Sequence, residues 1–291
     1  MAGIDINRTT DGIDLPPAVS NEIWGALVEE SAVMRAARRI TLPGRGVSIP
    51  LITGDAEAAW VDETDEKPVS RPTLSNKTMT PYTLAVIVPF SNQFRRDLPG
   101  LYAELARRLP FSLGKKFDET VYGGTAPGDN FDTLTTAPTK ELSADDPFGS
   151  LNEALVDVAT AGGDLTAWIA TPALHGTLLG ARDVLGRQFF VSDPANQRTV
   201  GSVFGAPVYK TRGDMGDSIG IAGDWAGSAV YGTVEGVQVS ISDQATLTDG
   251  ETTLNLWQRN MFAVRAEIEV GFRVRDVNHF VGIQAPAPAG G

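Results

Sequence analysis

The sequence contains no cysteine, which excludes disulfide bonds and metal sites built from thiolates. Histidine is nearly as scarce, because only His175 and His279 occur, so a histidine-rich metal centre is excluded as well. A chain without cysteine suits assembly in a reducing compartment. We therefore expect neither a cofactor nor a metal ion.

Long apolar runs and an excess of positive charge are also missing. No stretch of about 18 apolar residues is present, and residues 1–17 have neither the basic start nor the apolar core of a signal peptide. We expect a soluble chain that does not enter a membrane. The formal net charge of −12 argues against sequence-independent DNA binding through a basic face and favours a surface that repels phosphate.

The 291 residues that are present suffice for one large domain or two ordinary ones, with a sizeable core. The chain has 31 glycines and 18 prolines among many strand-forming residues, which is typical of mixed helix and sheet with exposed loops. We therefore predict an α+β fold.

Residues 97–123 carry the longest helical pattern. Its apolar stripe consists of Leu98, Leu101, Leu105, Leu109, Leu113, Phe117 and Val121. Asp97 is placed to cap the helix and Gly123 to end it, whereas Pro110 is expected to kink or restart it. The helix would be about 37 Å long, which predicts a spine along a surface or between two lobes. The alternative is an ordinary long core helix.

Residues 43–90 change to a period of two. The alternating apolar positions are Val47, Ile49 and Leu51 on the way out and Leu84, Val86 and Val88 on the way back. A polar excursion lies between them, so we predict a long two-stranded arm whose tip is supported by another subunit. The predicted contact residues are Asp62, Glu63, Asp65, Glu66, Lys67, Arg71 and Lys77. The alternative is a solvated surface hairpin with a flexible tip.

The remaining segments predict a second lobe and a strand-rich end. A helix is expected from Ser20 to about Arg39 and another from about Phe148 to Thr160. Residues 167–172 read as a buried strand, and a helix is expected to begin at Thr171-Pro172. In the last long strand Phe262, Val264, Ala266, Ile268 and Val270 share one face, while Arg265, Glu267 and Glu269 share the other.

None of the short stretches that resemble ligand-binding or catalytic motifs is interpreted as a functional site. Gly123-Gly124 and Pro127-Gly128 lack the spacing of phosphate-binding loops, and the acidic cluster that begins at Asp62 lacks the order of a calcium loop. The tripeptide at 212–214, Arg-Gly-Asp, is read as a turn. No G-x-S-x-G motif accompanies either histidine, and both histidines are predicted to be packing or surface residues. We predict no catalytic residue.

The order of the segments carries a resemblance that no single motif does. The ordered segments are LPPAVSNEIWGALVEESAVMRAAR (15–38), VPFSNQFRRD (88–97), the spine helix, TAWIATPALHGTLL (166–179), FGAPVY (204–209), IAGDW (221–225) and RAEIEVGFRVRDVNHFVGI (265–283). Together they resemble the major capsid proteins of tailed bacteriophages, which have the Hong Kong 97-type fold.

The resemblance implies a division of the chain. The segments are an N-terminal arm (1–18), an N-terminal helix of a peripheral lobe (19–42), an extended loop (43–90), the spine helix with the peripheral lobe (91–146), an axial lobe (147–228), strands that return to the peripheral lobe (229–284) and a disordered tail (285–291). It also implies self-assembly of hexamers and pentamers into an icosahedral shell around double-stranded DNA, without sequence-specific contact. The expected location is the virion capsid, after assembly in the host cytoplasm.

Two departures qualify the resemblance. The first folded helix is expected near Ser20, so a separate scaffold protein, besides a portal, is the expectation. Some family members also join subunits through a loop lysine and an asparagine; Lys67, Lys77 and Asn278 are the available residue types, but no motif matches that site. The alternatives are an encapsulin-like cellular compartment and an α/β hydrolase-like enzyme.

Overall fold

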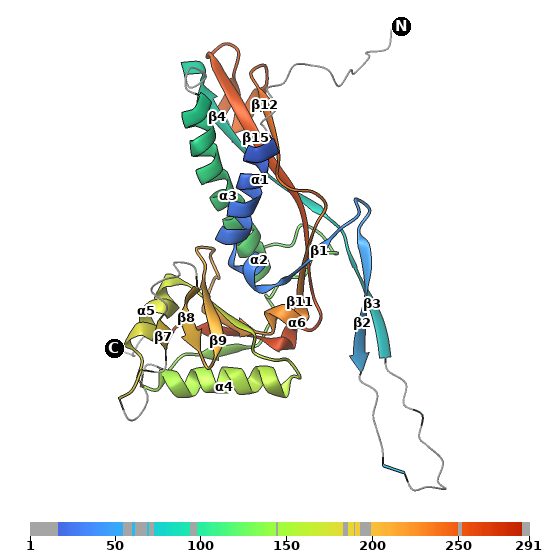
Figure 1. Ribbon diagram of the computed structural model, residues 1–291, viewed down its shortest axis with the longest axis vertical. Coiled ribbons are helices and arrows are strands. Elements are labelled where there is room, and N and C mark those ends of the chain that lie inside the picture. Colours follow the sequence, from blue (N-terminus) through green and yellow to red (C-terminus); the bar gives the residue numbers. More distant parts are fainter. Residues whose placement is uncertain are drawn as a thin grey trace.

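The computed structural model describes residues 17–54, 60–61, 69, 73–93, 98–143, 145–182, 186–188, 190–192, 199–249 and 252–286. These residues form two lobes and a two-stranded arm that projects away from both (Figure 1). The predicted N-terminal arm up to residue 16, the capping Asp97 and residues 287–291 of the tail lie outside the described residues.

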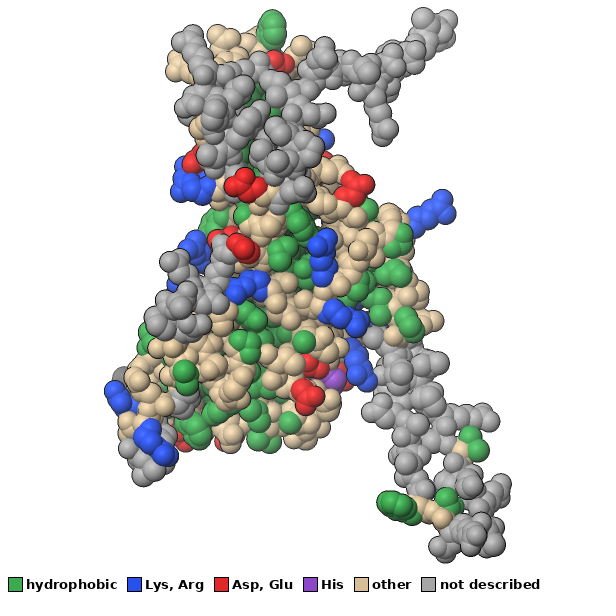
Figure 2. Space-filling model, in the orientation of Figure 1, with side chains coloured by type: hydrophobic (Ala, Val, Ile, Leu, Met, Phe, Trp, Pro, Cys, Tyr) green, Lys and Arg blue, Asp and Glu red, His purple; other side chains and the backbone are tan. Residues whose placement is uncertain are grey.

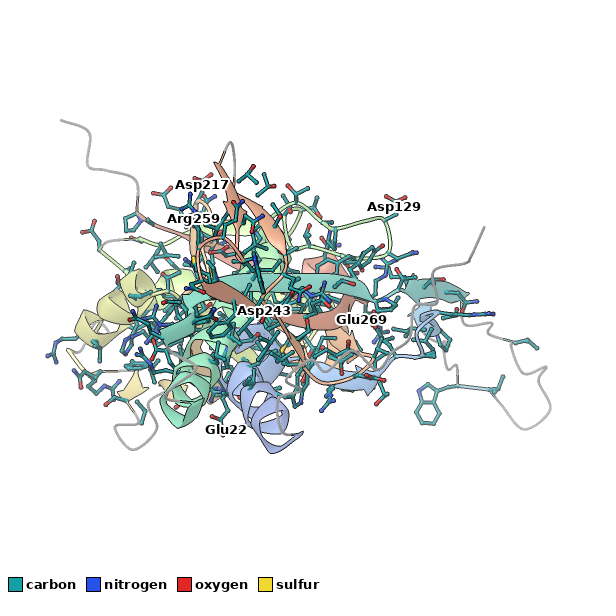
Figure 3. The ribbon with its side chains drawn as sticks, turned by 90° about the horizontal axis from the view of Figure 1, so that it is seen from above. Glu22, Asp129, Asp217, Asp243, Arg259 and Glu269 are labelled. Carbon is teal, nitrogen blue, oxygen red and sulfur yellow. The ribbon has the colours of Figure 1, made fainter. Side chains whose placement is uncertain are left out.

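The first lobe is built on a five-stranded sheet in the order β1-β11-β15-β12, with β4 paired to β15. Its strands are β1 (Arg38–Thr41), β4 (Tyr82–Ser91), β11 (Ala229–Thr233), β12 (Gln238–Ser242) and β15 (Met261–Val274). One edge of β15 carries β4, and the other carries β12 and then β11. Helices α1 (Pro17–Glu30) and α3 (Leu98–Tyr122) lie together on one face of this sheet (Figures 1 and 3).

Apolar alternation explains how this lobe closes. The members of the spine stripe whose side chains are described, Leu105, Leu109, Leu113, Phe117 and Val121, are all buried. They meet the predicted apolar face of β15, which is buried from Phe262 to Val270 at every second residue. Both patterns are confirmed. At the far end of this lobe β13 (Thr246–Asp249) and β14 (Thr252–Asn255) form a small hairpin.

The second lobe is a seven-stranded sheet in the order β5-β16-β10-β6-β9-β8-β7. The strands are β5 (Thr139–Glu141), β6 (Ala167–Ala170), β7 (Val191–Ser192), β8 (Thr199–Val203), β9 (Ala206–Lys210), β10 (Ser218–Gly223) and β16 (Phe280–Gln284). Helices α4 (Pro147–Thr160) and α5 (Pro172–Gly180) flank it, as the sequence predicted. The range predicted for the axial lobe, 147–228, does not contain β5 and β16. These two strands nevertheless belong to this sheet, where they pair with each other at one edge.

The helix does not restart at Pro110, because α3 runs without interruption from Leu98 to Tyr122. A proline inside a helix removes one backbone hydrogen bond and costs about 3 kcal/mol. Leu109 and Leu113 on either side are buried in the same core. Burial of the stripe on both sides of the proline therefore offsets the local cost.

The predicted helix from Ser20 to Arg39 is also wrong in its second half. α1 ends at Glu30, a short α2 (Ala32–Ala36) begins after Ser31, and Arg38 already belongs to β1. The Ser31 hydroxyl accepts a hydrogen bond from the backbone N–H of Met34, which makes it an N-cap in the middle of the predicted helix. β1 then pairs in parallel with β11, which removes these residues from the helix.

The predicted pairing of the arm needs correction as well. β2 (Val47–Gly54) pairs with β3 (Thr73–Met79), and not with the strand that contains Leu84, Val86 and Val88. Those three residues lie in β4, where they pack against the core of the first lobe. Their alternation therefore reflects partial burial of one face of β4 against the core, and not membership of the arm.

Candidate functional site at the root of the arm

The arm is an antiparallel pair whose register begins at Val47 opposite Met79. Among the described residues β2 and β3 form a sheet of two strands by themselves. At about 3.3 Å per residue, the eight residues of β2 make a strand roughly 26 Å long, whose inner end lies against the body. A lone two-stranded hairpin is marginally stable in water, so the way in which this arm is attached matters.

Met79 fixes the inner end of the arm by filling a hole in the first lobe. Its side chain is fully buried in a small cluster with Leu42 and Val230. Two glycines make room for it, since a Cβ atom at Gly271 would lie 2.7 Å from Met79 Cγ and one at Gly232 would lie 2.8 Å from Met79 Sδ. Any side chain at either glycine would therefore push Met79 out.

Arg273 joins three segments by hydrogen bonds. Its Nη1 lies 2.6 Å from Asp132 Oδ1, and its Nη2 donates to Asn130 Oδ1 at 2.8 Å. Its Nε donates to the carbonyl of Thr78 in the arm at 2.8 Å. The arginine side chain is about nine-tenths buried, and a buried arginine whose donors are used in this way holds its partners rigidly.

Lys77 completes this arrangement, which we call the root cluster: Lys77, Asn130, Asp132 and Arg273. Lys77 Nζ donates to the carbonyl of Val274 at 2.7 Å and lies 3.2 Å from Asp132 Oδ2. The same Oδ2 accepts the backbone N–H of Val274 at 3.0 Å. Asp132 thus lies between two cations from two strands, and the cluster sets the direction in which the arm leaves the body. Figure 3 shows nearby Asp129 on the side from which the arm departs.

Of the seven predicted contact residues, Asp62, Glu63, Asp65, Glu66, Lys67 and Arg71 lie outside the described residues. Lys77 lies at the root of the arm and contacts its own chain. Sequence reasoning missed Arg273 and Asp132. Period two places residue 273 on the same face of β15 as the charged residues 265, 267 and 269, and nothing in the pattern reveals that the arm covers it.

A buried carboxylate forms a second junction, between the lobes. Asp118 of α3 accepts hydrogen bonds from the Ser31 hydroxyl at 2.5 Å, the backbone N–H of Ala32 at 2.9 Å and the hydroxyl of Thr211 at 3.3 Å. Burial raises the pKa of Asp118 from 3.8 to about 6, although these hydrogen bonds oppose the rise. Burial and the nearby Asp118 also raise the pKa of Tyr122. Asp118 thereby ties α2 and the spine to the loop that follows β9.

The two histidines have packing roles, as predicted. His279 is buried, with Nδ1 2.5 Å from the Ser228 hydroxyl and Nε2 3.1 Å from the carbonyl of Ala161. The His175 ring meets the Phe190 ring edge to face at 5.8 Å between centroids. Burial, with Lys210 nearby, lowers the pKa of His175.

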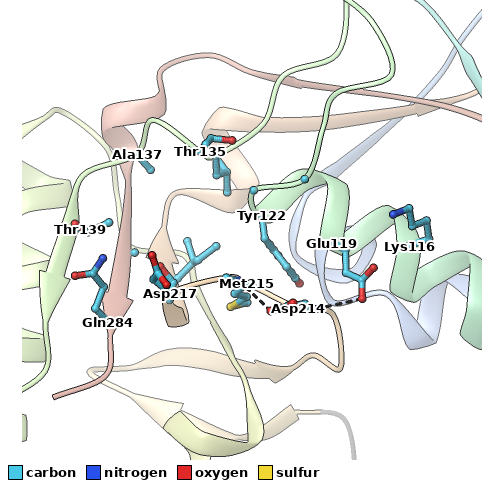
Figure 4. Close-up of a pocket in the computed structure, with 17 residues that line it drawn as sticks. Lys116, Glu119, Tyr122, Thr135, Ala137, Thr139, Asp214, Met215, Asp217 and Gln284 are labelled. Carbon is cyan, nitrogen blue, oxygen red and sulfur yellow. Dashed lines mark hydrogen bonds between the residues drawn. The ribbon is translucent and has the colours of Figure 1, made fainter. Parts of the chain in front are cut away.

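A polar cleft of about 550 Å³ opens between the two lobes (Figure 4). Glu119, Asp214, Asp217 and Gln284 line it, and the backbone N–H of Asp214 donates to Glu119 Oε1 at 3.5 Å. In the part of the chain that the structure describes, no group of three or more acidic, histidine or cysteine side chains is arranged to hold a metal ion. No helix within that part is long and apolar enough to cross a membrane.

The two lobes, the spine and the projecting arm define a class, the capsid subunits of tailed phages. A chain of Mycobacterium phage Adephagia superposes with a TM-score of 0.69 at 21% identity, covering 89% of this chain and 91% of that chain. A chain of Microbacterium phage Oxtober96 gives a TM-score of 0.68 at 21% identity, covering 98% and 95%. At these identities the likeness shows the fold, which is the Hong Kong 97-type fold that the sequence predicted.

Sequence comparison then gives the family. The probable major capsid protein gp17 of Mycobacterium phage L5 is 28% identical over 289 residues, covering 92% of this chain and 88% of that protein. The model of the phage capsid family matches residues 12–285, and the chain belongs to this family. It is a major capsid protein of a tailed phage, a structural protein rather than an enzyme. The curated relatives that match are phage capsid proteins, which favours a capsid over an encapsulin-like compartment or a hydrolase-like enzyme.

Proposed function

We propose that this chain builds an icosahedral shell of hexamers and pentamers around double-stranded DNA, and that the arm joins each subunit to its neighbour. The observation that carries the proposal is the combination of a projecting hairpin and a rigid root. β2 and β3 make a separate two-stranded sheet, whereas Arg273 and Met79 fix its inner end. A hairpin that is held at its root and, among the described residues, pairs with no further strand is suited to lie on another copy of the chain.

Fixing the root in advance lowers the cost of assembly. Association has to offset the ordering of side chains and loops, so an element that is already oriented binds more tightly for the same contact area. The root cluster supplies that orientation through Asp132, which holds the arm and β15 together. In a closed symmetric assembly the same contact repeats at every subunit, so modest contacts add up to a stable shell.

The finer division of labour follows the resemblance. We assign the five-stranded sheet with the spine to the peripheral lobe and the seven-stranded sheet to the axial lobe. The N-terminal arm (1–18) crosses a neighbour, and the acidic residues from Asp62 to Glu66 with Lys67 and Arg71 contact it through the extended loop. The self-association that capsid structures imply supports this assignment.

The charge balance supports a container that does not grip its contents. With a net charge of −12, the chain lacks the cationic excess from which non-specific DNA affinity arises. The packaged DNA is therefore held by confinement, without sequence-specific contact. A separate scaffold protein and a portal complete the set of partners, and assembly takes place in the host cytoplasm before the protein resides in the virion capsid.

Removing the outer part of the arm tests the proposal. Residues 55–72 are replaced by Asn-Gly, a dipeptide that closes a two-residue hairpin and leaves Lys77 and Met79 in place. We expect a monomer that unfolds at the same urea concentration as the parent chain, whereas the parent forms rings or shells by electron microscopy and light scattering. As a matched control, the turn between β13 and β14 is exchanged for the same dipeptide. Normal shells from the shortened arm contradict the proposal.

A further inference from the structure

The outer end of the arm exposes apolar side chains, which we call the tip patch: Trp60, Val61 and Val69. Trp60 is fully exposed and Val69 is 83% exposed. Figure 2 shows hydrophobic side chains gathered at this end of the arm. Tryptophan is highly buried on average in folded proteins, and it is enriched among the residues that dominate binding energy at protein interfaces.

The subunit's own body does not cover the tip patch in the structure, since Trp60 is fully exposed and Val69 nearly so. The inner end of the hairpin is held by Met79 and Arg273. A surface that buries the patch in a shell would come from a neighbouring copy.

A matching acceptor lies on the first lobe, beside the root. This pocket, which we call the aromatic pocket, has a volume of about 180 Å³. Its apolar lining consists of Tyr82, Leu84, Phe117, Pro127, Phe131 and Val270. A drug-sized ligand needs about 300 Å³ or more, so the pocket is of a size for one large side chain.

The walls of the aromatic pocket suit an indole ring. Phe131 meets Tyr82 edge to face at 6.2 Å between ring centroids and meets Phe117 in the same manner at 6.3 Å. A fourth aromatic ring placed among these three continues the arrangement, and such ring contacts are worth more than the buried area alone. An aliphatic side chain would not make these contacts.

Charge also matches the tip patch to this pocket. Lys116, an exposed residue of α3, lies at the rim. In the sequence, Trp60 and Val61 are followed directly by Asp62 and Glu63. These two acidic residues adjoin the inserted side chain in the sequence and complement the charge of Lys116, and opposite charges around an apolar anchor fix register and speed association.

We infer that Trp60 of one subunit inserts into the aromatic pocket of a neighbouring subunit. The inference rests on the proposed arm contact and names the side chain and the pocket that make it. The partner is a second copy of this chain, because the pocket and the tip patch recur on every copy. The tryptophan is the anchor, and the charged residues around it guide docking.

The first test compares two exposed tryptophans. Trp60→Ala is expected to raise the protein concentration needed for assembly about tenfold or more, the effect of losing an interface anchor. Trp257→Ala removes a tryptophan that is 71% exposed at the end of β14, and it is expected to change that concentration less than about twofold. Trp60→Phe is expected to restore part of the loss. Equal behaviour of the two alanine variants overturns the inference.

The second test uses the absence of native cysteine. One preparation carries Val61→Cys and the other Thr125→Cys, at the rim of the aromatic pocket. Mixed during assembly and oxidised, they are expected to give a disulfide-linked dimer on a non-reducing gel. Val61→Cys mixed with Val156→Cys, which lies on α4 and is 49% exposed, is the control and is expected to give none.

The experiments distinguish failure of the tryptophan contact from failure of the proposed function. Shells that form from the parent chain, with no Thr125 cross-link beyond the Val156 control, overturn the tryptophan contact and leave the arm's role standing. Absence of any ring or shell from the parent chain refutes the proposed function and, with it, the contact.

Discussion

Asp118 offers the sharpest test of the structure, because its environment raises its pKa to about 6 from 3.8. Over this interval the folded chain binds a proton at Asp118 that the unfolded chain releases. The free energy of unfolding contributed by this group is therefore fully present at low pH and falls as the pH rises through about 4 to 6. A difference of about two pKa units corresponds to roughly 3 kcal/mol.

The perturbation is Asp118→Asn, which removes the titrating proton and keeps the shape. Asparagine turns an N–H toward a site where Ala32 donates, so the variant also loses a constant amount of stability at every pH. This constant loss cancels when the free-energy difference between variant and parent is compared at two pH values. Relative to the parent, the variant is expected to gain roughly 3 kcal/mol in its free energy of unfolding between pH 4 and pH 7.

Urea denaturation of both chains in the short-arm background, where assembly does not interfere, provides the assay. Fluorescence of the buried Trp225 and Trp168 reports unfolding at each pH. A free-energy difference between variant and parent that stays constant from pH 4 to pH 7 would refute the reasoning. It would mean that the carboxylate is solvated or already neutralised in the folded chain.

Three further predictions concern the root and the spine. Arg273→Ala leaves Asp132 without its closest cation and is expected to cost about 3 kcal/mol in urea denaturation and to speed proteolytic cleavage within the arm; an unchanged cleavage rate would contradict the root role. Gly271→Ala is expected to cost about 1–3 kcal/mol because its Cβ meets Met79, and the same substitution should cost less when it is made in a Met79→Ala chain, as a double-mutant cycle measures. Ser31→Ala is expected to lower the melting temperature through the loss of about 1 kcal/mol of capping, and an unchanged melting temperature would argue against the cap.

Helices and strands were predicted correctly from the sequence where a single apolar periodicity determines which face is buried. The apolar faces of β15 and α3 and the helix predicted from about Phe148 to Thr160 each follow from spacing that no distant contact overrides. A restart of the helix at Pro110, one of the two predicted outcomes, does not occur because burial of the flanking leucines is a tertiary effect. The predicted continuation of the helix through Ser31 failed because its competitor, the Asp118 carboxylate, lies far away along the chain.

The candidate site was predictable in outline and not in detail. A polar excursion between two alternating runs correctly indicated an arm, but the returning run belongs to the body because β15 captures it along its whole length. Lys77 was predicted at the tip and lies at the root. The root cluster joins residues from three distant segments, and no local pattern contains such a combination.

The C-terminal end of β15 connects the arm to both sheets of the subunit. Arg273 and Val274, where the arm is tethered, lie at its last residues, and after a single short turn the chain enters β16 of the other sheet. Under the arm contact proposed above, a force that a neighbouring copy exerts on the hairpin would be transmitted through β15 to both sheets of the subunit. A shell built from such contacts would distribute strain over many subunits before any one sheet separates.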